Sequence, residues 1–313
     1  MDGFRILTID GGGIRGVVPA IVLERLCAEP ELASWLDHVD LFAGTSTGGI
    51  LALGLAAGLS VSTIRDLYEQ RSASVFHDTL FDDIRDLGKI IGADYSIANL
   101  QRELERVFGD RTLGSLSRRV LITAFDLDNE APGFRTWKPK LFHNFPGSDS
   151  DAEQLARSVA AYTSAAPTYF ESVDGYIDGG VYATNPSMCA LAQTQDPRVP
   201  ASERTLLGDV RLLSLGTGRS LVYIEGDRHD WGYLQWVRPL ISLMLDGTNG
   251  IADYQCARIL GDRYFRLAPT FPPGREIAMD DVNEIPYLVD FALSLDLGEL
   301  VGWLRDTWVD LTP

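Results

Sequence analysis

Apolar residues in the N-terminal part of the chain form two repeats of one pattern. A mostly apolar run at residues 4–9 is typical of a buried strand, and residues 17–27 then place apolar side chains at helical spacing. The scheme returns at residues 39–43 and 49–57, again with a glycine-containing turn between strand and helix. The pattern therefore predicts two successive strand–turn–helix units.

Strand and helix signals continue to alternate further along the chain. They predict helices over residues 62–74, 97–108 and 152–162 and strands over residues 119–125 and 210–215. No low-complexity segment, internal repeat or linker interrupts this order. We therefore predict an α/β fold in which helices cover a mainly parallel central sheet.

Apolar residues recur at helical spacing near the C-terminus as well. The run consists of Leu288, Phe291, Ala292 and Leu295, followed by Trp303, Leu304 and Trp308. We interpret it as helix that packs back on the rest of the protein, the alternative being an apolar face that touches a membrane.

Composition and charge limit the class of protein. With 313 residues, 45% of them hydrophobic and 23% charged, the chain can bury a substantial core. Its net charge of −17 argues against a nucleic-acid partner, because the attraction to phosphate that basic proteins have is absent. The longest apolar stretch, residues 49–59, is about half of the ~20 residues that a transmembrane helix needs, and no signal peptide begins the chain. We therefore expect a cytoplasmic protein whose contact with membranes is at most peripheral.

The first motif with chemistry in it is Gly44-Thr45-Ser46-Thr47-Gly48, which places Ser46 at a tight turn from strand to helix. A G-x-S-x-G sequence at such a turn is typical of a nucleophile elbow. Gly44 and Gly48 leave room for a strained backbone, and the N-terminus of the following helix favours a developing alkoxide. The alternative is a glycine turn with a capping serine.

The second motif, DGGGIRG at residues 10–16, fits two kinds of site. It satisfies G-x-G-x-x-G, but a Rossmann nucleotide site also needs an acidic residue at the end of the next strand. Asp40 instead precedes the apolar part of that strand, which leads into Ser46. A Rossmann-like nucleotide-binding enzyme therefore remains only as an alternative.

For an acyl hydrolase the same loop has a direct use. Glycine amides at a helix N-terminus can stabilise the oxyanion that forms when a serine attacks an ester. Gly12 and Gly13 are the candidate donors, within a loop that Gly11 and Gly16 complete. Arg15 holds this loop or adds positive charge to it.

A serine nucleophile also needs a base. The chain has four histidines, His38, His77, His143 and His229. None has a site-like sequence context, although His229 fits the chain order of a Ser-acid-His triad, so an α/β-hydrolase-type esterase is a second alternative. Asp178 suits the role better, because it follows a short strand and precedes Gly179 and Gly180, which let another group come close.

Together these motifs resemble those of the patatin-like phospholipase family, whose members use a Ser-Asp dyad. The resemblance extends to residues 163–170, 184–186 and 213–218 and thus covers residues 4 to about 220. It implies a patatin-like three-layer architecture. It also implies a catalytic core at residues 4–220 and a C-terminal extension, residues 221–313, packed on the same domain.

The resemblance implies a lipid acyl hydrolase, of the phospholipase A type or a non-specific carboxylester hydrolase. Ser46 would attack the ester, Asp178 would accept its proton, and water would release the acyl-serine intermediate. The implied substrates are phospholipids or galactolipids, and no cofactor is implied. No grouping of histidine, cysteine or carboxylate residues has the spacing of metal ligands. Aromatic candidates for an acyl channel are Trp137, Phe142, Phe145 and Phe271, although the protein core is the usual place for such side chains.

Overall fold

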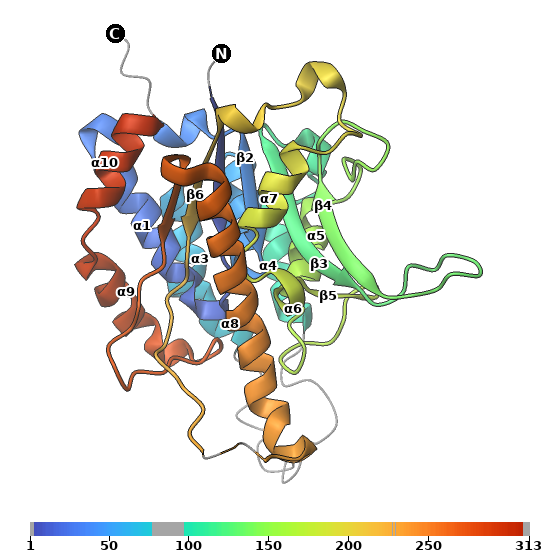
Figure 1. The fold of residues 1–313 in the computed structure, drawn as a ribbon, viewed down its shortest axis with the longest axis vertical. Coiled ribbons are helices and arrows are strands. Elements are labelled where there is room, and N and C mark those ends of the chain that lie inside the picture. The colour runs from blue at the N-terminus through green and yellow to red at the C-terminus, as the bar shows by residue number, and fades with distance from the viewer. Residues whose placement is uncertain (1–2, 77–96, 227, 229, 309–313) are drawn as a thin grey trace.

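A seven-stranded sheet forms the centre of the computed structural model, which describes residues 3–76, 97–226, 228 and 230–308 (Figure 1). In spatial order the strands are β4 (Lys138–His143), β3 (Arg119–Asp126), β2 (Leu41–Thr45), β1 (Phe4–Ile9), β6 (Val210–Leu215) and β7 (Tyr264–Leu267), while β5 (Tyr176–Asp178) also pairs with β3. β4 and β5 run antiparallel to β3, and the other pairs are parallel. The prediction of a mainly parallel sheet is confirmed.

Both faces of this sheet are buried. Neighbouring residues of a strand point to opposite faces, so Leu7 and Ile9 of β1 belong to the larger of two apolar cores and Ile6 to the smaller. Because helices cover both faces, a central strand is apolar at nearly every position. This is why a mostly apolar run marked β1 in the sequence.

The helices over the larger core are α1 (Val17–Ala28), α2 (Thr47–Ala56), α3 (Val61–Phe76), α4 (Ile97–Phe108), α5 (Ala156–Ser164), α9 (Ile285–Ser294) and α10 (Gly298–Thr307). The last two contain the apolar run near the C-terminus. Its residues Leu288, Ala292, Leu304 and Trp308 are fully buried, and the Trp308 ring packs edge to face on Trp35 at a centroid distance of 5.9 Å. The prediction that this run packs back on the protein is confirmed.

The opposite face carries α6 (Gly180–Ala183), α7 (Ser187–Thr194) and α8 (Tyr233–Leu260), which lie in front of the sheet in Figure 1. Ala190 and Leu191 of α7 and Cys256 and Leu260 of α8 build the smaller core with the strands. Helices thus cover the sheet on both sides, and the predicted three-layer α/β architecture is confirmed. In the part of the chain that the structure describes, no helix is long and apolar enough to cross a membrane.

Short 3-10 helices connect these elements at Gly13–Gly16, Pro30–Leu32, Trp35–His38, Leu113–Ser115, Ala201–Glu203, Leu207–Asp209, Gly261–Arg263 and Val282–Glu284. Two helices begin at other residues than the sequence pattern predicts. α2 begins at Thr47, directly after the serine of the elbow, and α5 begins only at Ala156. The residues before α5 form a turn in which the Gln154 amide donates to the Asp151 carbonyl oxygen at 2.9 Å.

Candidate active site

Ser46 lies on a strained turn between β2 and α2. Its backbone has φ 54° and ψ −127°, a left-handed region that a residue with a side chain rarely adopts. A Cβ atom at Gly44 would lie 2.1 Å from the Gly48 carbonyl oxygen, and one at Gly48 would lie 2.2 Å from that of Ile9. Steric crowding therefore explains why both positions are glycine, because the helix after Ser46 packs directly on the ends of β1 and β2.

β5 brings Asp178 to the same place. One edge of β3 carries β4, and the other pairs with β2 as far as Thr45, which lies opposite Thr123. Because a strand has two edges, β5 lies on the edge that β2 leaves free, and Asp178 lies opposite Ala124, the next residue of β3. In space, Asp178 therefore lies just beyond the carboxyl end of β2. It lines one cavity together with Ser46.

The environment of Asp178 favours a carboxyl group that takes up protons readily. The residue is 5% exposed, and burial raises its pKa to about 6. A hydrogen bond with the Ser46 hydroxyl limits this rise, as does the Gly180 amide, which donates to Oδ1 at 2.7 Å. Gly179 packs so closely on β3 that a Cβ atom would lie 2.2 Å from the Thr123 hydroxyl oxygen. The two glycines after Asp178 therefore let the carboxylate sit against both β3 and its own backbone.

The glycine loop follows β1 and lies beside the elbow. Its outer amides have partners, because Gly11 donates to the Thr184 carbonyl oxygen at 3.0 Å and Ile14 donates to that of Met279 at 2.8 Å. Within the described residues, the backbone amides of Gly12 and Gly13 donate no backbone hydrogen bond. These are the two amides that the sequence indicated as oxyanion donors, and Gly13 lines the cavity with Ser46.

The remaining residues of the loop hold its shape. Gly13 has φ 58°, and a Cβ atom there would lie 2.0 Å from the Met279 carbonyl oxygen. Arg15 donates from Nε to the Gly12 carbonyl oxygen at 3.3 Å, which matches the loop-holding role among the two that the sequence suggested. Gly16 packs on the Thr47 hydroxyl of the elbow, so the two glycine motifs touch each other.

A family model described as patatin-like phospholipase matches residues 7–191, which include both glycine motifs and Asp178. This chain belongs to the patatin-like phospholipase family. The resemblance inferred from the motifs is therefore confirmed, and the activity of this family member is lipid hydrolysis. The structure does not support the nucleotide-binding alternative, which needs an acidic residue at the carboxyl end of β2. Asp40 lies at the amino end of β2, where it accepts a hydrogen bond from the Arg5 amide.

Relatives match this chain over most of its length. Protein teg of Priestia megaterium is 27% identical over 98% of this chain and 100% of that protein. The cGAMP-activated phospholipase of Pseudomonas aeruginosa is 29% identical over 84% of this chain and 78% of that protein. Among solved structures, VipD from Legionella pneumophila covers 93% of this chain and 67% of its own, with a TM-score of 0.42 and 12% sequence identity.

An apolar cavity of about 130 Å³ reaches from Ser46 and Asp178 between α2, α3 and α4. Its walls include Ile14, Ile50, Leu100, Leu104, Val107 and Phe170. The aromatic candidates from the sequence lie elsewhere: Phe142, Phe145 and Phe271 are buried in the core, and Trp137 is 70% exposed. The amphipathic spacing of α4 was visible in the sequence, but not that its apolar face borders the serine.

The structure brings no histidine of its described residues into this cavity. His143 is 3% exposed and its Nε2 lies 3.3 Å from Asp149, and His38 lies at the amino edge of the sheet. His77 and His229, the latter being the candidate for a triad, lie outside the described residues. Within residues 3–76 and 97–308, apart from 227 and 229, no group of three or more histidine, cysteine or acidic side chains is placed to hold a metal ion.

Proposed function

We propose that this lipid hydrolase cleaves lipid acyl esters with a Ser46–Asp178 dyad, as a phospholipase A or a non-specific carboxylester hydrolase. One observation carries the proposal. The serine of a strained elbow and a buried carboxylate with a pKa of about 6 share the end of one apolar cavity. A buried carboxylate with a pKa near the working pH is a far better base than one in water.

The residues of the site then divide the reaction among them. Ser46 attacks the ester carbonyl carbon while Asp178 accepts the hydroxyl proton, and the amides of Gly12 and Gly13 stabilise the oxyanion. The proton passes from Asp178 to the leaving alcohol, which leaves an acyl-Ser46 ester. Water then attacks this ester while Asp178 takes its proton, and that proton passes to Oγ of Ser46 as the acid is released.

The cavity supports lipid acyl esters as the substrate class. Its apolar walls suit an acyl chain, and Ser46 lies where the carbonyl of that chain would be held. Met279 and Asp280 also line the cavity, so the chain after residue 220 contributes to the site. We therefore place residues 221–313 in the same domain as the catalytic core.

A fluorophosphonate probe tests the dyad directly, because it reacts covalently with activated serines. We expect tandem mass spectrometry to find the label on Ser46, and incubation with a mixed lipid extract to release free fatty acids. Ser46→Ala should abolish both results, whereas Ser62→Ala, a change at an exposed serine of α3, should alter neither. A label on another serine would contradict the proposal.

A further inference from the structure

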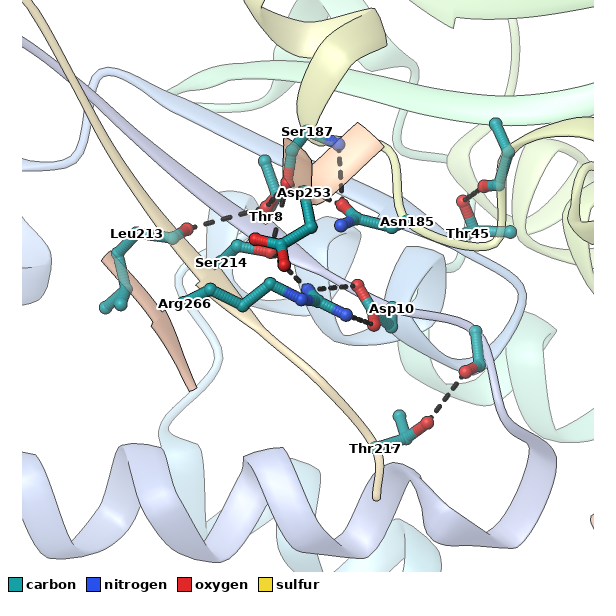
Figure 2. A network of polar contacts seen from close by, with 12 residues as sticks. Thr8, Asp10, Thr45, Asn185, Ser187, Leu213, Ser214, Thr217, Asp253 and Arg266 are labelled. Atoms are coloured by element: carbon teal, nitrogen blue, oxygen red, sulfur yellow. Dashed lines mark hydrogen bonds and ion pairs between the residues drawn. The ribbon is translucent and has the colours of Figure 1, made fainter. Parts of the chain in front are cut away.

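The glycine loop is tied to parts of the chain far beyond the residues that the family model matches. Asp10, the residue before the loop, forms a two-point ion pair with Arg266 of β7, shown in Figure 2. Nη2 of Arg266 lies 2.6 Å from Oδ2 of Asp10, and Nη1 lies 3.1 Å from Oδ1. β6 separates β7 from β1, so the arginine side chain reaches across a whole strand.

Residues on β6 and after it complete the support. Ser214, opposite Arg266 in the sheet, accepts a hydrogen bond from Nη1 of the arginine at 2.6 Å. The Thr217 hydroxyl donates to the Gly11 carbonyl oxygen at 2.8 Å, and the Met279 carbonyl oxygen accepts from Ile14 at 2.8 Å. These contacts restrain the loop on both sides of Gly12 and Gly13.

The pair is buried, and burial raises the pKa of the Asp10 carboxyl above its ordinary value although the Arg266 guanidinium opposes the rise. The side chains of Asp10 and Arg266 are 2% and 11% exposed. Although burial opposes the charge of the guanidinium, the Asp10 carboxylate raises the pKa of Arg266 above its ordinary value. An arginine stays protonated in proteins, and its planar fork matches a carboxylate at two points, so the contact fixes the direction of the Asp10 side chain as well as its charge.

We propose that Arg266 is a positioning residue for catalysis, which acts by holding Asp10 and with it the oxyanion donors of the loop. The inference rests on the proposed function of Gly12 and Gly13. Loss of one oxyanion donor costs about 10²- to 10³-fold in kcat, and a donor that moves away from the oxyanion is lost in the same way. Substrate binding in the apolar cavity does not involve the pair, so KM should respond little.

The test compares Arg266→Lys, Arg266→Met and Asp10→Asn with the parent protein, using a soluble p-nitrophenyl ester at a temperature where each variant is folded. Lysine keeps the charge but contacts the carboxylate at one point, so we expect kcat to fall about tenfold, with KM within about twofold of the parent's. Arg266→Met and Asp10→Asn should lower kcat by about 10²-fold. Fluorophosphonate labelling of Ser46 should slow in the same order, because the probe's phosphoryl oxygen occupies the oxyanion position.

Arg263→Lys is the matched control. Arg263 precedes β7 and donates to the carbonyl oxygens of Leu207 and Val210, away from the loop, so its replacement should leave kcat unchanged. A folded Arg266→Lys variant with the parent's kcat and labelling rate would overturn the inference, as would losses no greater than those of Arg263→Lys. If the parent itself is not labelled at Ser46, the proposed function fails and this inference fails with it.

Discussion

Asp10 and Asp178 have the same local setting in the chain. Asp10 directly follows β1 and Asp178 is the last residue of β5; each precedes at least two glycines and is almost completely buried, with 2% and 5% of its surface exposed. Their partners differ. Asp10 faces the guanidinium of Arg266, whereas Asp178 has the Ser46 hydroxyl and the Gly180 amide as its hydrogen-bonding partners. The same three letters, DGG, thus place one buried carboxyl group against an arginine and the other against a serine hydroxyl.

Tertiary partners decide between these outcomes. The Arg266 guanidinium, which reaches Asp10 from 256 residues away, offsets part of the cost of burying the Asp10 charge, although burial still raises the pKa of that carboxyl. The donors that hydrogen-bond Asp178 are neutral, and burial raises its pKa to about 6. Five predictions test this difference, beginning with the largest expected effect.

Removal of either member of the dyad should abolish turnover. Asp178→Asn keeps size and hydrogen bonding but cannot accept the proton, so kcat should fall by at least about 10²- to 10⁴-fold, and Ser46→Ala by as much. Circular dichroism should show both variants folded. His38, His77, His143 and His229 provide the comparison, since each His→Ala variant should stay within about tenfold of the parent. A nearly active Asp178→Asn variant beside an inactive His229→Ala variant would replace the dyad by a triad.

Stability should respond most strongly at Asp10. Asp10→Asn removes the carboxylate that pairs with the buried Arg266 guanidinium, which costs about 3–5 kcal/mol of unfolding free energy. Urea unfolding at pH 7 measures this loss. Asp128→Asn is the control, because the Asp128–Arg135 pair lies at the surface and should contribute less than about 1 kcal/mol. Equal losses of unfolding free energy in the two variants would show that the buried pair stabilises the protein no more than the surface pair.

The same substitution at Asp178 should act in the opposite direction. The pKa of this carboxyl rises from 3.8 to about 6 on folding, so the charged form costs the folded state about 3 kcal/mol. The penalty is absent below about pH 4 and complete above about pH 7. Asp178→Asn should therefore melt a few degrees above the parent at pH 8 and close to it at pH 4. A variant that melts below the parent at pH 8 would contradict the high pKa.

The pH dependence of the reaction reports the same group. Asp178 accepts a proton only when it is ionised, so kcat/KM should fall about tenfold for each pH unit below about 6 and level off above about pH 7. Initial rates with a soluble ester over this range measure the midpoint. A midpoint near 4 would mean that the base is a solvated carboxyl group.

Chelation should have the smallest effect. In the proposed mechanism Asp178 supplies the base, and the described residues contain no group of three or more metal-ligating side chains, so excess EDTA should leave hydrolysis of a medium-chain p-nitrophenyl ester unchanged. Activity that disappears with EDTA and returns with calcium would show that a metal site takes part.

Local sequence was sufficient for the positions of Ser46 and Asp178. Ser46 follows β2, a strand of the parallel part of the sheet, and sites of α/β proteins lie at the carboxyl ends of such strands; Asp178 ends the short strand β5 directly before two glycines. The fold class could be predicted from the alternation of strands and helices, because the hydrophobic pattern of each helix or strand lies within its own residues.

Long-range partners left weaker signals. Arg266 is marked in the sequence solely as a charged residue inside the short apolar run YFRL, and nothing near it points to Asp10. The pattern also did not reveal α8, because Pro239, Gly247 and Gly250 interrupt its helical spacing. Trp137 precedes β4 at the end of the exposed β3–β4 connection, a position that composition alone does not distinguish from the core.

The ribosome makes the glycine loop long before it makes the residue that holds it. Arg266 follows Asp10 by 256 residues, an interval on the order of tens of seconds at ~5–20 residues per second. Met279 follows later still. During that interval the nascent chain already carries Ser46 and Asp178 but lacks the clamp on its oxyanion donors. If this clamp positions these donors as proposed, we expect an unfinished chain to hydrolyse lipid esters more slowly than the complete protein.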